Sequence, residues 1–171
     1  RSSLAKGVSS AMLDTMNQSV TTGRYREIPA ARASQLLLPR PSLAGCLFAA
    51  VIRDTRRLAL APEQRANFFP ASPLCSVTWY FEGSAHLITC GDSSDAQPGN
   101  TVLPELFFTG PHTGPLASWN DGPIHAMTVT FYPEAWQALT GKSIEKFINK
   151  CVPLDKVAQG EVLALLLGMA T

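Results

Sequence analysis

Apolar and polar residues alternate along several short segments of this chain, with the period of two that is typical of half-buried β-strands. In residues 76–82 the large apolar positions recur at every second residue, at Val77, Trp79 and Phe81. Residues 124–132 alternate in the same way, and one of their faces consists of His125, Met127, Val129 and Phe131. Apolar runs of strand length also occur at residues 46–54, 85–90, 105–110 and 115–119. The central part of the chain is therefore expected to be made of strands.

Two turn signals connect these predicted strands. Gly83 and Ser84 follow the first alternating segment and predict a hairpin with residues 85–90. The sequence Asn-Asp-Gly-Pro at residues 120–123 separates residues 115–119 from the second alternating segment. Asn, Asp and Gly accept positive φ and Pro presets its own φ, so this tetrapeptide predicts a tight turn.

The period changes to that of helices after residue 132. Pro133 fits the first turn of a helix, where its missing N–H costs nothing, and Gly141 predicts the end of that helix. Ser143 predicts the start of a second helix, whose apolar stripe consists of Ile144, Phe147, Ile148 and Cys151. Pro153 ends that stripe, and a third, leucine-rich helix is expected in residues 159–170.

Strands that come first and helices that come last predict a mainly β domain of the α+β class. We expect an antiparallel β-barrel or sandwich followed by short C-terminal helices, in residues 41–171. Residues 1–40 are expected to form a flexible N-terminal arm or a peripheral helix, since two prolines interrupt the chain at positions 39 and 41. A peripheral helix would place on one face the residues Met12, Leu13, Met16 and Val20.

Composition and charge exclude several classes of function. The 171 residues carry a formal net charge of +1, which gives no broad electrostatic footprint for nucleic acid. No apolar run approaches the roughly 20 residues that span a bilayer, so no membrane contact is expected. The four cysteines are scattered and form no C-x-x-C pair, which favours reduced thiols and a cytoplasmic location.

The residues that carry chemistry form no recognisable catalytic motif. The three histidines, His86, His112 and His125, include no H-x-H pair of the kind that a metal-binding β-barrel uses. The chain also lacks a G-x-S-x-G nucleophile motif and a glycine-rich phosphate loop. We therefore expect no enzyme activity and no cofactor. His125 has two interpretations, a hydrogen-bonded core imidazole or a polar group that orients a ligand in an apolar cavity.

Three segments resemble the N-terminal regulatory domain of transcriptional regulators of the AraC/XylS type. They are NFFPASPLCSVTWYFEG, FFTGPHTGPLASWNDGPIHAMTVTFYPEAWQALTG and SIEKFINKCVPLD, and they fall within residues 43–157. This resemblance implies a cupin-like β-barrel that binds a small-molecule effector and forms a homodimer. It also implies that DNA is contacted by a helix-turn-helix domain C-terminal to this chain.

The resemblance leads to the first hypothesis, an effector-sensing and dimerisation domain of a DNA-binding regulator. The predicted ligand pocket in the barrel interior consists of Trp79, Phe81, Trp119, His125 and Met127. The predicted dimer contacts on the C-terminal helices are Ile144, Phe147, Ile148, Leu163, Leu166 and Leu167. The alternative is a small metal-dependent β-barrel enzyme that uses the three histidines as ligands. A third possibility is a solidly packed barrel that serves only to dimerise.

Overall fold

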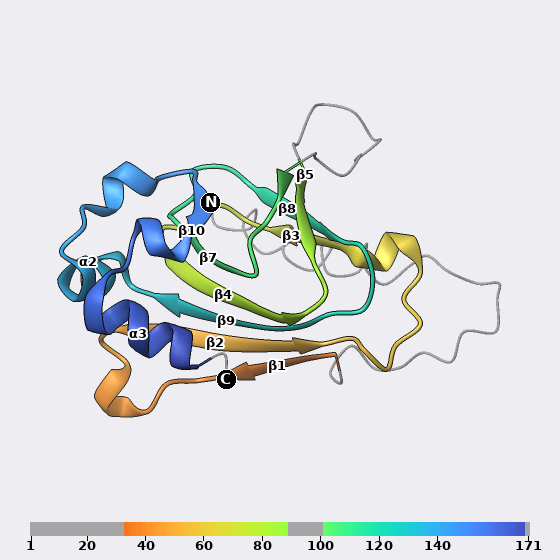
Figure 1. Ribbon diagram of the computed structural model, residues 1–171, viewed down its shortest axis with the longest axis horizontal. Helices are drawn as coiled ribbons and strands as arrows, with labels where there is room; N and C mark the ends of the chain where they lie inside the picture. Colours follow the sequence, from red (N-terminus) through yellow and green to blue (C-terminus); the bar gives the residue numbers. More distant parts are fainter. Residues whose placement is uncertain (1–32, 89–100, 170–171) are drawn as a thin grey trace, which may run out of the picture.

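The computed structural model describes residues 33–88 and 101–169. In this part of the chain two antiparallel β-sheets form an open sandwich, and two short α-helices lie together at one end of it (Figure 1). The mainly β class with short C-terminal helices, predicted from the periodicity, is confirmed. The amphipathic segment from Met12 to Val20 and the loop predicted at residues 91–100 lie outside the described residues.

The elements have the following bounds. The six-stranded sheet has the spatial order β1 (Ser34–Leu37), β2 (Leu47–Asp54), β9 (His125–Phe131), β4 (Cys75–Glu82), β7 (Leu106–Thr109) and β10 (Cys151–Pro153). The four-stranded sheet has the order β3 (Ala66–Phe69), β8 (Leu116–Asn120), β5 (Ala85–Ile88) and β6 (Thr101–Val102). The α-helices are α2 (Pro133–Thr140) and α3 (Gly160–Gly168), and 3-10 helices cover Pro41–Leu43, Pro62–Arg65, Ile144–Phe147 and Leu154–Lys156. Among the described helices, none is both long and apolar enough to cross a bilayer.

The large apolar side chains of the six-stranded sheet lie under the C-terminal helices. The core between the sheet and the helices consists of Cys75, Val77, Trp79, Phe108, Val129, Phe131, Trp136, Leu154, Val157, Ala158 and Leu166. Phe108 stacks on Trp136 of α2 with ring centroids 4.8 Å apart. The indole N–H of Trp79 donates a 2.9 Å hydrogen bond to the carbonyl oxygen of Leu166 in α3. This face of the sheet is therefore filled by the chain itself.

The strands that the turn signals connect lie in different sheets. β4 belongs to the six-stranded sheet and β5 to the four-stranded sheet, so the hairpin predicted at Gly83 is wrong. The turn after Asn120 likewise carries the chain from β8 in one sheet to β9 in the other. Each turn crosses between the layers because both of its flanking strands find their partners far along the chain, as β4 does in β7 and β9.

The second predicted helix is replaced by a 3-10 turn and a strand. Helical structure is limited there to Ile144–Phe147, and Cys151–Pro153 pairs with β7 as β10. Between them Asn149 adopts φ 58°, and its side-chain oxygen accepts a 2.9 Å hydrogen bond from the Thr113 N–H. Pairing with the exposed edge of β7 and this anchored turn outweigh the helical spacing of the apolar residues.

The six-stranded sheet begins before the expected domain boundary at residue 41. β1 lies within the predicted N-terminal arm, yet it pairs with β2 in a regular antiparallel register, with Ser34 opposite Arg53. Its four residues are all exposed, which explains why no alternation marked it as a strand. Residues 1–32 of the predicted arm lie outside the described residues.

Candidate functional site

A cavity of about 430 Å³ lies between the two sheets. The six-stranded sheet contributes the face of β4 and β9 that points away from the helices, together with β2 and β7. The four-stranded sheet covers it with side chains of β3, β5 and β8. The described residues that line it are Ser34, Phe48, Val51, Arg53, Asn67, Phe69, Pro70, Ser72, Leu74, Cys75, Ser76, Thr78, Tyr80, Leu87, Leu103, Phe107, Thr109, Gly110, His112, Leu116, Ser118, Ile124, Ala126, Thr128, Thr130 and Cys151. This volume falls in the range of small-molecule sites.

Hydroxyl groups form the floor of the cavity. The pairing of β4 with β9 places Thr78 opposite Thr128 and Ser76 opposite Thr130. Thr78 and Thr128 share a 2.9 Å hydrogen bond between their hydroxyl oxygens. Because a hydroxyl has one donor and two acceptor positions, each keeps further capacity for a ligand. Phe107 lies beside Thr78 on β7 and adds an apolar wall.

Tyr80 presents a neutral phenol to the cavity. Burial raises the pKa of this phenol above its ordinary value, and its oxygen accepts a 3.3 Å hydrogen bond from the side-chain amide of Asn120. Its ring stacks on Phe107 at a centroid distance of 6.2 Å. A phenol held in this way can still donate its O–H to a ligand.

Two nitrogen atoms of the lining are buried without a hydrogen-bond partner. They are Nε2 of His112 and Nε of Arg53. Burial lowers the pKa of His112, which favours the neutral imidazole. Buried polar atoms in folded proteins are nearly always hydrogen-bonded, so both nitrogens point to a partner other than the described chain.

The thiols of the cavity are not activated for nucleophilic chemistry. Burial raises the pKa of Cys75 to about 12, and burial also raises the pKa of Cys151. A thiolate is the nucleophilic form of cysteine, and both side chains are therefore protonated near neutral pH. Neither thiol is therefore primed as a nucleophile.

The cavity opens to solvent on the side of β2 and β3. Phe48 and Val51 on β2 line the cavity and remain 52% and 36% exposed. Phe69 on β3 lines it from the other sheet and is 48% exposed. These side chains form an apolar entrance to the cavity.

None of the five residues predicted to form the pocket lines this cavity. Trp79 is part of the core under the helices, and Phe81 and Met127 pack against that core. His125 stacks on Phe81, with ring centroids 5.0 Å apart. Trp119 follows the lining residue Ser118 on β8, so its side chain points to the outer face of the four-stranded sheet.

The alternating strands are present, but the cavity lies on the face opposite to the predicted one. Both faces of β4 and β9 are covered, one by the helices and the other by the second sheet. The larger aromatic side chains meet the helices, and the smaller hydroxyl-bearing ones leave the space between the sheets. The row of Ser76, Thr78 and Tyr80 opposite Ala126, Thr128 and Thr130 was the signal in the sequence that marked the cavity.

The three histidines lie in different environments. His86 bonds the carboxylate of Asp121 at 2.7 Å, His112 lines the cavity, and His125 lies on Phe81. Within residues 33–88 and 101–169, His, Cys, Asp and Glu form no group of three that could hold a metal ion. The metal-dependent enzyme considered as an alternative therefore gains no support from these histidines.

The six residues predicted for dimer contacts divide into two groups. Ile144, Phe147 and Leu163 pack against the core, and Leu166 is buried within it. Ile148 and Leu167 are 39% and 48% exposed. The large apolar side chains that reach solvent on α3 and at its C-cap are Leu165, Leu167 and Met169, and only Leu167 of these was among the predicted contacts.

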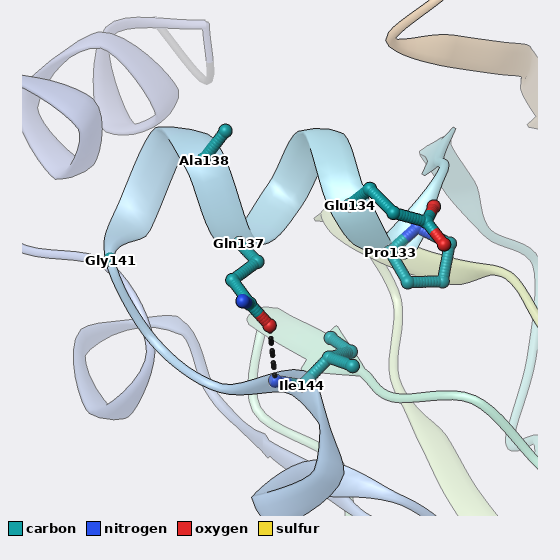
Figure 2. A pocket seen from close by; sticks show the side chains of 6 residues that line it. All are labelled: Pro133, Glu134, Gln137, Ala138, Gly141 and Ile144. Atoms are coloured by element: carbon teal, nitrogen blue, oxygen red, sulfur yellow. Dashed lines mark hydrogen bonds between the residues drawn. The ribbon is translucent and has the colours of Figure 1, made fainter.

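A second hollow, of about 440 Å³, lies on the surface beside α2. Figure 2 shows its lining, Pro133, Glu134, Gln137, Ala138, Gly141 and Ile144. The side-chain oxygen of Gln137 accepts a 3.4 Å hydrogen bond from the backbone N–H of Ile144, so this polar group is already paired. The cavity between the sheets has both an apolar wall and unpaired polar atoms, and it is the better candidate for a binding site.

Comparisons with models of protein families, with curated proteins and with solved structures found no match to this chain.

Proposed function

We propose that this chain is the effector-sensing and dimerisation domain of a transcriptional regulator of the AraC/XylS type. The observation that carries the sensing role is the cavity of about 430 Å³ between the sheets, with its hydroxyl-lined floor and unpaired nitrogens. The regulatory context rests on the resemblance of the sequence segments. In this proposal DNA is contacted by a helix-turn-helix domain outside these residues.

Two strands connect the cavity to the helices. On β4, Thr78 faces the cavity while its neighbour Trp79 bonds the carbonyl oxygen of Leu166 in α3. On β9, Thr128 faces the cavity while its neighbour Val129 belongs to the core under the helices. A ligand that moves these strands therefore also moves the core residues on which α3 packs. It shifts the position of the helix only as far as it binds one arrangement better than the other.

Filling the cavity tests the sensing role. We expect Thr128→Phe to occupy the space above the hydroxyl floor and to abolish the stabilisation of the chain by its effector. In a thermal-shift screen of metabolites, an effector at 100 times its Kd adds about 2.7 kcal/mol to the apparent stability of the wild type.

The same substitution at Thr101 is the matched control, because this threonine is exposed on β6 and does not line the cavity. The Thr101→Phe chain should respond to the effector as the wild type does. Sensing in this cavity is refuted if the effector stabilises the Thr128→Phe chain as much as the wild type.

The exposed face of α3 is the proposed contact with a second copy. Leu165 is 70% exposed, and Met169, one helical turn further at the C-cap, is 46% exposed. We expect Leu165→Glu to convert the dimer into a monomer in analytical ultracentrifugation, with little change in the free energy of unfolding. Leu38→Glu, at a position 76% exposed beyond β1, is the control that should leave the dimer intact. A dimer that persists in the Leu165→Glu chain would exclude this face.

A further inference from the structure

We infer that the effector is an organic carboxylate with an apolar body, and that Arg53 binds its carboxylate group. This inference rests on the proposed sensing function and names the chemical class of its ligand. Three features of the cavity support it. They are the charge of its lining, the environment of Arg53 and the order of the side chains along the floor.

Arg53 is the only described residue of the lining with a permanent charge. The lining contains no aspartate and no glutamate, and its remaining polar groups are hydroxyls, amides, thiols and the neutral His112. Arg53 takes part in no ion pair within the described residues, and its Nε is buried without a hydrogen-bond partner. Arg53 as a whole is half-buried, so the unpaired group is its Nε–H, and an anionic ligand would supply the missing acceptor.

Two carboxylates, those of Asp54 and Glu82, are paired with Arg56 and not with Arg53. Arg56 binds Asp54 through two hydrogen bonds of 3.0 and 2.7 Å, and it binds Glu82 at 2.6 Å. Asp54 follows Arg53 on β2, so its side chain points to the opposite face of the sheet. Arg56 thus pairs with both Asp54 and Glu82 outside the cavity. The guanidinium of Arg53 therefore remains available to a ligand in the cavity.

The register of the strands places Arg53 at one end of the floor. Arg53 on β2 and Tyr80 on β4 both lie opposite Ala126 on β9. The planar guanidinium of arginine matches the two oxygens of a carboxylate, and the neutral phenol on the other side of Ala126 is a further donor. These two side chains form a polar end that is suited to a carboxylate.

The rest of the floor is suited to an apolar body. Thr78 and Thr128 come next along the strands, flanked by Val51 on β2 and Phe107 on β7. From Tyr80 to Ser76 is four residues, or about 13 Å of extended strand. The opposite sheet contributes Leu87 and Leu116 to the lining. The cavity therefore has a cationic end and an apolar length, the complement of an amphipathic carboxylate.

Matched pairs of probes test the assignment. Octanoate and benzoate are compared with octanol and benzyl alcohol for binding to the 171-residue chain by isothermal titration calorimetry. We expect each carboxylate to bind the wild type about tenfold or more tightly than its alcohol, because a charge-assisted hydrogen bond contributes an affinity difference of that size. The Arg53→Gln chain should lose this preference and keep its affinity for the alcohols. Arg57→Gln, at an exposed position outside the lining, is the control for net charge and should change neither affinity.

The outcomes separate this inference from the sensing function. If the alcohols bind the wild type as tightly as the carboxylates, or if the Arg53→Gln chain retains the preference, the carboxylate assignment is overturned and cavity sensing stands. If neither class binds, the assignment is also overturned, and the metabolite screen with Thr128→Phe decides the sensing function by itself. The comparison of probes on the wild type is informative even if the Arg53→Gln chain fails to fold.

Discussion

Replacing Trp79 with alanine is expected to lower the free energy of unfolding by about 3–5 kcal/mol, the usual cost of removing a large aromatic side chain from a core. Trp79 is 1% exposed and lies at the centre of the six-stranded sheet, on β4. Its ring packs in the core between the sheet and the helices, and its N–H is bonded to the Leu166 carbonyl oxygen, 87 residues further along the chain. Loss of the ring therefore weakens the attachment of α3 as well as the packing of the sheet. Urea unfolding followed by far-ultraviolet circular dichroism measures the change without relying on tryptophan fluorescence.

Two further variants separate packing from hydrogen bonding. Trp79→Phe retains part of the ring volume but leaves the Leu166 carbonyl oxygen without its donor, which should cost about 1–3 kcal/mol. Trp119→Ala removes the same side chain from β8, where it is only partly buried, and should cost less than Trp79→Ala. Equal losses at the two tryptophans would contradict the placement of Trp79 at the junction of sheet and helices.

The strands could be predicted because their alternation reflects burial at each position. In β4 the apolar residues from Val77 to Phe81 do share one face, and that face is buried. The α2 helix could be predicted because Pro133 and Gly141 mark its ends, and Gly141 adopts φ 66° as the C-terminal residue of a helix often does. Local chemistry determines both features, so a single sequence reveals them.

The pairing of the strands depends on contacts between distant residues. Nothing close to Gly83 in the sequence shows that β4 pairs with β7 and β9 while β5 pairs with β6 and β8. The same holds for the helical stripe after Ser143, since the strand that replaces its end forms only because β7 offers a free edge. The local sequence at Gly83 and after Ser143 is compatible with both the predicted and the observed structure, so it does not decide between them.

The cavity was missed because a strand covered on both faces has two buried sides. The aromatic face of β4 and β9 was the more apolar, and a pocket was expected there. The helices fill that face, and the cavity lies on the side of the hydroxyl groups. Arg53 carried no signal of its own in the sequence, because its burial depends on β9 and on the facing sheet.

Adding a single methyl group at Gly110 is expected to lower the free energy of unfolding more than any other change considered except Trp79→Ala. Gly110 follows β7, and its N–H donates a 2.9 Å hydrogen bond to the carbonyl oxygen of Lys150. A Cβ at this position would overlap the backbone carbonyl group of Phe147. Backbone cannot rotate away as a flexible side chain can, so the segment from Ile144 to Lys150 would have to move. That movement would disturb the edge-to-face contact of Phe147 with Phe108, whose ring centroids are 5.8 Å apart.

We therefore expect Gly110→Ala to lower the free energy of unfolding by about 3 kcal/mol, at the upper end of the usual cost of overpacking. Gly114→Ala is the matched control, because a Cβ there meets nothing within 4 Å, and its effect should stay within about 0.5 kcal/mol. Both glycines follow β7 closely, so the comparison isolates the close approach of Phe147 from the intrinsic cost of replacing glycine. Urea unfolding of the two variants measures the difference. If the two chains are equally stable, the segment after Ile144 does not cross over Gly110, and the attachment of β10 to β7 has to be placed differently.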